Sequence, residues 1–325
     1  MGKLSKVLLY AAAVFLLIMG AGIVYVQANW DRTHDVPVDA SFEVTSTPEA
    51  VENGRYLVYG PAHCAYCHTT PEQWSELDAG EEVPLSGGFS WELSVGKIYS
   101  TNLTPDKETG IGNVTDAELK RALRFNVAHD GRALFPFMDF HRMSDRDLHD
   151  VIAYLRSQPA VHNPIPEPDL NLTGKFMMST VIEPVDFGEE APEDSPVEEV
   201  SIERGKYLAE NVAGCMGCHS QRNPLDGTYE GERFAGGLEQ ESLKNPQESF
   251  VSPNITPDPE TGILAGWSED TFVSRFKAGG GISGTPMPWG AYQRMSEEDL
   301  RSIYKYLQTL EPVHNEVGET FRDGE

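Results

Sequence analysis

Two short stretches hold all four cysteines of the chain. "CAYCH" runs from Cys64 to His68, and "CMGCH" runs from Cys215 to His219. A Cys-x-x-Cys redox pair usually accompanies a βαβ pattern, and a four-cysteine zinc site wants its second pair about 15–20 residues away. Neither condition is met, because no βαβ pattern is visible and the second pair lies 151 residues downstream, beyond a linker.

The remaining chemistry is covalent haem attachment, for which Cys-x-x-Cys-His is the signature. Two thioether bonds hold the porphyrin edge, and the imidazole that follows binds the iron. The sequence therefore predicts two covalently bound haem c groups. The predicted attachment residues are Cys64, Cys67, Cys215 and Cys218, and the predicted proximal ligands are His68 and His219.

Each iron is expected to take a methionine as its second axial ligand, because His/Met ligation raises the haem potential. In "GTPMPWGAY", Met287 stands between two prolines on a predicted loop, whereas Met295 directly precedes a helix and is expected to pack. In "LFPFMDFHRM", Met138 is the preferred ligand and Met143 is the alternative.

The match between the two methionine segments is imperfect. Ungapped alignment places Phe135 opposite Met287, so a three-residue shift is needed to bring Met138 into register. His129, His141 or an open iron are further alternatives for the first site.

These motifs belong to a segment that is written twice, which indicates duplicated domains. "NLTPDKETGI" from Asn102 matches "NITPDPETGI" from Asn254, and "RMSDRDLHDVIAYLRSQPAVHN" from Arg142 matches "RMSEEDLRSIYKYLQTLEPVHN" from Arg294. The offset is 151 residues at the cysteines and 152 from Asn102 onward, so one small indel separates the halves.

Helices are expected to position the motifs. Thr115 and Glu118 form a possible capping box, and Ser144 and Ser296 can each cap a helix with one apolar face. A short helix is predicted before each cysteine pair, around 50–58 and 202–209. Sustained period-2 alternation, the signal of strands, is scarce.

A glycine and a tyrosine stand ten and eight residues before each cysteine pair. Gly54 and Tyr56 precede Cys64, and Gly205 and Tyr207 precede Cys215. We interpret both pairs as structural: the glycine permits close helix crossing, and the tyrosine packs against the terminal helix.

The N-terminus contains twenty residues without charge, Val7 to Val26. At about 1.5 Å per residue they match the roughly 30 Å hydrocarbon core of a membrane. Lys3 and Lys6 precede the span, which favours a cytoplasmic N-terminus and an exported remainder. An uncleaved anchor is preferred; a cleaved signal peptide ending at "VQA" is the alternative, although signal cores usually run only about 7–15 residues.

Composition fits a globular protein of about two domains, with 39% apolar and 23% charged residues. The net charge of −26 excludes nucleic acid as a natural partner, because phosphates would be repelled. The predicted organisation is an anchor (1–28), a linker (29–47), a first domain (48–162), an acidic, Pro-rich connector (163–200), a second domain (201–316) and an acidic tail (317–325). We expect a mainly α fold.

With these motifs, the chain from about residue 48 to 315 resembles the class I cytochromes c. It resembles more closely the membrane-bound multihaem cytochrome c subunits of periplasmic alcohol, aldehyde and gluconate dehydrogenases, through "YSTNLTPDKETGIG", "VSPNITPDPETGI", "MPWGAYQRMSEEDL" and "NPIPEPDLNL".

The resemblance implies two tandem class I cytochrome c domains on the periplasmic side of a bacterial inner membrane. It also implies electron transfer from a dehydrogenase or quinol-oxidising donor to a terminal oxidase or another cytochrome, with no substrate chemistry of its own. The alternative is a dihaem enzyme, such as a cytochrome c peroxidase or a thiosulfate dehydrogenase, which needs one open or labile iron.

Overall fold

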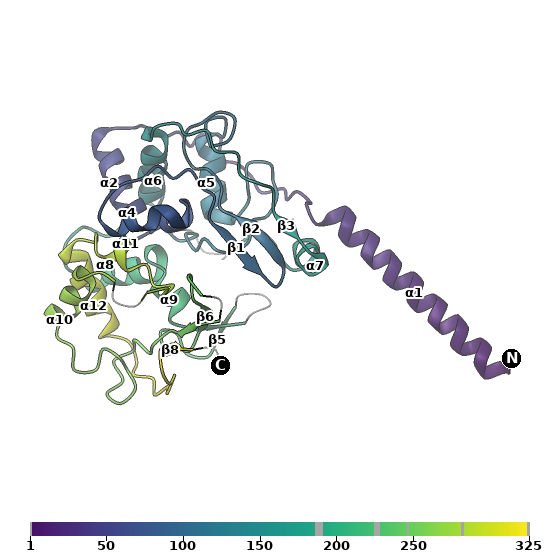
Figure 1. The fold of residues 1–325 in the computed structure, drawn as a ribbon. Helices are drawn as coiled ribbons and strands as arrows, with labels where there is room; N and C mark the ends of the chain where they lie inside the picture. Colours follow the sequence, from purple (N-terminus) through teal and green to yellow (C-terminus); the bar gives the residue numbers. More distant parts are fainter. Residues whose placement is uncertain (1, 186–190, 224–227, 246, 281–282, 324–325) are drawn as a thin grey trace.

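The computed structural model describes residues 2–185, 191–223, 228–245, 247–280 and 283–323. Some residues of the predicted segments lie outside this part: residue 1 of the anchor, 186–190 of the connector, 224–227, 246 and 281–282 of the second domain, and 324–325 of the tail. A long helix, α1 (Lys3–Asn29), projects from the rest of the molecule, where two groups of helices lie side by side (Figure 1).

Helix α1 covers the predicted apolar span. Within the described residues it is the one helix long and apolar enough to cross a membrane, with a mean hydropathy of 2.6 over its best window. Length and composition of this kind suit an anchor and a signal sequence alike.

The two groups of helices correspond to the duplicated sequence. We call the segment from α2 to α6 the first repeat and the segment from α8 to α12 the second repeat. The first repeat contains α2 (Pro48–Tyr59), α3 (Cys64–Cys67), a 3₁₀ turn (Pro71–Gln73), α4 (Trp74–Asp78), α5 (Asp116–Phe125) and α6 (Asp145–Ser157). The second contains α8 (Ile202–Tyr207), a π turn (Leu208–Val212), α9 (Cys215–Cys218), α10 (Glu269–Lys277), α11 (Trp289–Tyr292) and α12 (Glu297–Leu307).

The predicted helix caps are confirmed. Thr115 and Glu118 form a reciprocal capping box at the start of α5. The Ser144 and Ser296 side chains accept the backbone N–H of the third residue of α6 and α12, each at 3.0 Å. These local contacts satisfy donors that a helix start otherwise leaves unpaired.

Short strands, which the sequence analysis missed, form small antiparallel sheets. β1 (Ser90–Leu93), β2 (Gly96–Tyr99) and β3 (Asp169–Leu170) make the first, and β4 (Gln221–Arg222) and β5 (Tyr229–Glu230) make the second. The third consists of β6 (Glu239–Glu241), β7 (Ser249–Val251) and β8 (Phe321–Arg322). Strands of two to four residues are too short to produce a readable alternation of polar and apolar residues.

The predicted connector contains regular structure of its own. It supplies β3 to the sheet of the first repeat, and it then forms α7 (Leu172–Thr180). Similarly, β8 follows the second repeat and pairs antiparallel with β7.

Glycine permits the helix crossing in both repeats, as expected. A Cβ atom at Gly54 of α2 would lie 1.8 Å from the carbonyl oxygen of Asp150 in α6. A Cβ atom at Gly205 of α8 would lie 1.9 Å from the carbonyl oxygen of Ser302 in α12. Any side chain at either position would force the two helices apart.

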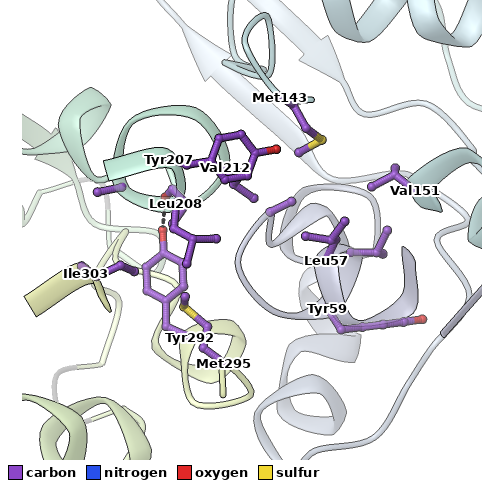
Figure 2. Close-up of a cluster of buried hydrophobic side chains, with 14 of the residues drawn as sticks. Leu57, Tyr59, Met143, Val151, Tyr207, Leu208, Val212, Tyr292, Met295 and Ile303 are labelled. Atoms are coloured by element: carbon purple, nitrogen blue, oxygen red, sulfur yellow. Dashed lines mark hydrogen bonds between the residues drawn. The ribbon is translucent and has the colours of Figure 1, made fainter. Parts of the chain in front are cut away.

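The main hydrophobic core runs across both repeats. Leu57 and Met143 of the first repeat and Leu208 and Met295 of the second belong to one buried cluster (Figure 2). A smaller second cluster lies under the first sheet and α7, and it includes Ile98, Leu170 and Met178.

Each repeat also sends the hydroxyl of one tyrosine to the other repeat; Tyr56 is half-buried and Tyr207 is buried. The Tyr56 hydroxyl donates to Asp299 Oδ2 of the second repeat at 2.6 Å and accepts the Ser296 N–H at 3.0 Å. Tyr207 makes the mirrored contacts to the first repeat, donating to Asp147 Oδ2 at 2.6 Å and accepting the Ser144 N–H at 2.9 Å. Each tyrosine was predicted to pack against the terminal helix, and its hydroxyl does reach a terminal helix, α6 or α12, which belongs to the other repeat.

Candidate haem-binding sites

Both Cys-x-x-Cys-His segments have the same local geometry. α3 and α9 are single helical turns, and the histidine N–H donates to the carbonyl of the first cysteine at 2.9 Å in each. The residue before the turn, His63 or Gly214, adopts a left-handed φ of 41° or 63°. A single turn places the thiols of residues i and i+3 on one face, where one planar group can reach both.

The two predicted proximal histidines are held in the same way. His68 Nδ1 lies 2.8 Å from the carbonyl oxygen of Thr101, and His219 Nδ1 lies 2.8 Å from that of Pro253. A carbonyl only accepts hydrogen bonds, so Nδ1 must carry the proton in each ring. Nε2 then keeps its lone pair and is free to bind iron, as in histidine ligands oriented by a second hydrogen bond.

The repeated "N-[LI]-T-P-D" loops fix these carbonyls. Asn102 follows Thr101 directly, and its Nδ2 donates to the carbonyl of Val161 at 2.8 Å. Asn254 follows Pro253 and donates to the carbonyl of Val313 at 2.7 Å. The loop motif thus anchors the acceptor of each histidine to the segment after the terminal helix. The sequence carried this signal as a repeated motif, but its role required the partners to be seen.

Burial controls the protonation of the attachment residues. It raises the pKa of all four thiols, to about 12 for Cys64, about 11 for Cys67 and about 12 for Cys215. It also lowers the pKa of both proximal imidazoles. Before haem is attached, the thiols are therefore protonated and the rings neutral at neutral pH, unlike the acidic thiol of a Cys-x-x-Cys redox catalyst.

The donor set fits a covalently held porphyrin. None of the four cysteines forms a disulfide bond. Cys64, Cys67 and Cys215 are half-buried and Cys218 is exposed, so each residue keeps some solvent-accessible surface even though partial burial shifts the pKa of its thiol. Across the described residues, no three His, Cys, Asp or Glu side chains gather as a metal site of their own. Each motif instead presents two thiols and one oriented imidazole, the set that haem c requires.

The two methionines predicted as second axial ligands are less buried than the two that pack in the core. Met143 and Met295 are each 1% exposed in the main core. Met287 is half-buried on a turn where the Trp289 N–H donates to its carbonyl at 2.8 Å. Met138 is also half-buried, on a loop between α5 and α6. Because Met143 is buried in the core, Met138 is the better candidate for the first site. Met138 and Met287 as axial ligands both stay predictions.

Two histidines of the first repeat were alternative ligands. His129 is exposed, whereas His141 is buried with Nδ1 2.9 Å from the carbonyl oxygen of Arg124. The Arg124 guanidinium in turn donates to the carbonyls of His141 and Met143 at 2.5 and 2.6 Å. This network links α5 to the segment before α6.

Comparison with known proteins identifies relatives over most of the chain. No family model matches. The chain is 32% identical over 303 residues to the cytochrome c subunit of the quinone alcohol dehydrogenase of Gluconacetobacter polyoxogenes, covering 84% of this chain and 59% of that protein. It is 29% identical to the fructose dehydrogenase cytochrome subunit of Gluconobacter japonicus, covering 83% and 54%.

A third relative matches end to end. The dihaem c-type cytochrome of Cereibacter sphaeroides is 27% identical over 319 residues, covering 94% of this chain and 98% of that protein. The chain spans less than two thirds of the two dehydrogenase subunits but nearly the full length of the dihaem protein. The chain is therefore a homologue of cytochrome c subunits of alcohol, fructose and gluconate dehydrogenases and of a dihaem cytochrome c, and this homology implies covalently bound haem c.

Proposed function

We propose that this protein is a membrane-anchored dihaem c-type cytochrome that passes electrons between a periplasmic donor and an acceptor. The donor is a dehydrogenase or a quinol-oxidising protein, and the acceptor is a terminal oxidase or another cytochrome. The observation that carries the proposal is the duplicated donor set, in which each imidazole Nδ1 is tied to a carbonyl 2.8 Å away.

In this proposal each repeat is a class I cytochrome c domain, at 48–162 and 201–316. Cys64 and Cys67 would hold one haem, and His68 and Met138 would bind its iron. Cys215 and Cys218 would hold the second haem, and His219 and Met287 would bind its iron. The recurrence of α2, α3, α5 and α6 as α8, α9, α10 and α12 supports the tandem arrangement.

Each haem would supply a one-electron carrier, and the chain's own residues would keep it in place. The His–carbonyl contacts prevent the rings from turning, and the loops of Asn102 and Asn254 hold the carbonyls. The shared core and the exchanged tyrosines keep the repeats from moving apart. A fixed distance between two carriers suits electron transfer, because it avoids a conformational step.

The charge of the chain favours a particular kind of partner. A net charge of −26 attracts redox proteins with basic docking surfaces and disfavours nucleic acid and anionic lipid. The apolar α1 supports retention at the inner membrane with both repeats on the periplasmic side.

Mass spectrometry and spectroscopy of the exported chain test this function. We expect a mass increase of two haems, intact α1, two low-spin irons and a methionine–iron charge-transfer band with the intensity of two sites. A chain without added haem would overturn the proposal. A high-spin iron that turns over peroxide or thiosulfate would favour the dihaem enzyme instead.

A further inference from the structure

Helix α7 lies against the end of α1 from which the repeats follow (Figure 1). Lys175 of α7 donates from Nζ to Gln27 Oε1 at 3.2 Å, and the same nitrogen lies 5.3 Å from the centre of the Trp30 ring. Val26 is the buried residue of α1, at 6% exposure. The two Lys175 contacts set α7 at the level of Gln27 and Trp30, where α1 ends.

That level corresponds to a membrane surface if α1 crosses the bilayer. The charge-free stretch ends at Val26, and at about 1.5 Å per residue its twenty residues fill the roughly 30 Å hydrocarbon layer. Tyr25 is 50% exposed and Trp30 follows five residues later. Tyrosine and tryptophan are enriched at this boundary, and a lysine beside them can direct its ammonium toward water.

One face of α7 carries large apolar side chains that the described structure leaves about half exposed. Leu172 is 48% exposed and Phe176 is 50% exposed, and a spacing of four residues places them on the same side of the helix. Val181, directly after the helix, is 40% exposed. In water, three apolar side chains exposed beside the end of α1 would add no stability, because their apolar surface is not removed from solvent.

The opposite face of α7 is firmly attached to the first repeat. Met178 is 7% exposed in the second hydrophobic cluster, and a Cβ atom at Gly174 would lie 2.2 Å from the carbonyl oxygen of Val95. Asn171 caps the helix with its Oδ1 and donates from Nδ2 to the carbonyl of Ser94 at 2.8 Å. Leu93, one residue before Ser94 at the end of β1, is 40% exposed. The apolar side chains therefore belong to a rigid surface.

Lipid is the occupant that the location favours. Outside α1, ten large apolar side chains of the described residues are exposed, and four of them, Leu93, Leu172, Phe176 and Val181, lie on α7 or next to it. We propose that α7 lies in the outer interface of the membrane that α1 enters, with Leu172 and Phe176 among the lipid chains. This inference rests on the proposed anchor and adds a second contact, which would fix the orientation of the first repeat toward the membrane.

Photo-crosslinking to lipid tests the inference on the full chain with its haems. The protein is reconstituted alone into phosphatidylcholine vesicles that contain a small fraction of phosphatidylcholine with a diazirine in its acyl chain. After illumination, lipid adducts are mapped on peptides by mass spectrometry. We expect adducts on α1 and on the peptide containing residues 172–181. We expect none on the peptide containing Val197 and Ile202, which are 66% and 45% exposed just before and at the start of α8, a helix that lies away from α1 and α7 (Figure 1).

A pair of double variants sharpens the experiment. Leu172→Glu with Phe176→Glu should lose the adducts on α7 and keep those on α1. Val197→Glu with Ile202→Glu should leave the pattern of the unmodified chain unchanged. An unchanged haem spectrum shows that each variant has folded.

The outcomes separate the inference from the proposed anchor. Adducts on α1 without adducts on α7 would overturn the α7 contact and leave the anchor intact, including the case in which α7 binds a protein absent from the vesicles. A chain that lacks α1, or in which α1 takes no lipid, would overturn both. If both helices carry adducts, and the double variant at Leu172 and Phe176 removes only those on α7, the α7 contact and the anchor are both supported.

Discussion

The two repeats share one framework but balance their buried charges differently where they meet. In the second repeat, the Asp299 carboxylate accepts a hydrogen bond from the Tyr56 hydroxyl and two from the Arg204 guanidinium, at 2.8 and 3.1 Å. The side chains of Arg204 and Asp299 are at most 5% exposed. In the first repeat, Asp147 accepts Tyr207, and the position equivalent to Arg204 is Asn53. Asn53 donates to Asp150 instead, at 3.3 Å.

This difference has an electrostatic consequence. Burial raises the pKa of Asp147, because its charged form is poorly solvated there. Asp299 is buried as deeply but has a guanidinium in contact. The duplication thus preserved the helix crossings and the tyrosine exchange, while the charges at the interface diverged. Four predictions test how far the repeats have diverged.

The largest effect is expected at the axial methionines. Met138→Ala and Met287→Ala should each abolish half of the methionine–iron charge-transfer band, because each removes one thioether ligand. Near-infrared absorption of the oxidised protein measures the band. Met143→Leu and Met295→Leu are the matched controls and should leave it intact, since both side chains are core residues. Loss of half the band in Met143→Leu would assign the first site to Met143.

The next effect concerns the ion pair that only the second repeat has. Arg204→Met leaves the Asp299 carboxylate buried without its charged partner, which should lower the free energy of unfolding by about 3–5 kcal/mol. Asn53→Ala at the equivalent position should cost about 1 kcal/mol, because it removes one hydrogen bond. Denaturant unfolding in detergent gives both values. Equal losses would show that the two sides of the interface are balanced alike.

The exchanged tyrosines should respond unequally. Tyr207→Phe deprives Asp147 of a donor and should cost about 2 kcal/mol, whereas Tyr56→Phe should cost about 1 kcal/mol because Arg204 still compensates Asp299. The same unfolding measurement applies to both variants, and Tyr10→Phe in α1, where the side chain is 67% exposed, serves as control. A larger loss for Tyr56→Phe would contradict the assigned difference.

The smallest effect is a pH dependence attached to Asp147. Its folded-state pKa is raised, so the folded state binds this proton more tightly than the unfolded state does. The stability that Asp147 contributes is therefore fully present at pH values below its ordinary pKa of 3.8, and it is lost as the pH rises through its raised pKa in the folded state. Asp147→Asn should gain stability relative to the unmodified chain across that window. An offset that is the same at about pH 4 and about pH 7 would refute this assignment.

Features that depend on neighbours in sequence were predictable. The capping residues Thr115, Ser144 and Ser296 act on N–H groups three residues away, and the apolar faces of α6 and α12 follow the helical period. The glycines Gly54 and Gly205 indicated close crossings because no side chain fits there. The homology found over most of the chain agrees with the resemblance inferred from the motifs.

Features that depend on distant partners were not predictable. Nothing local in Tyr56 or Tyr207 indicates that each hydroxyl bonds to the other repeat, and the predicted connector gave no sign of β3. Strands this short become stable only through the neighbours with which they pair. The role of the Asn102 loop likewise appeared only when its partner, the carbonyl of Val161, was in place.

The sequence by itself determined which residues can bond haem, how the chain is duplicated and where α5, α6 and α12 begin, because each of these depends on residue type and short spacing. Only the tertiary structure decided which carbonyl orients each histidine, how the repeats exchange tyrosines and that α7 packs against α1. The physical reason is that these contacts join residues from tens of positions to more than two hundred apart in the chain. Their geometry exists only after the helices have packed.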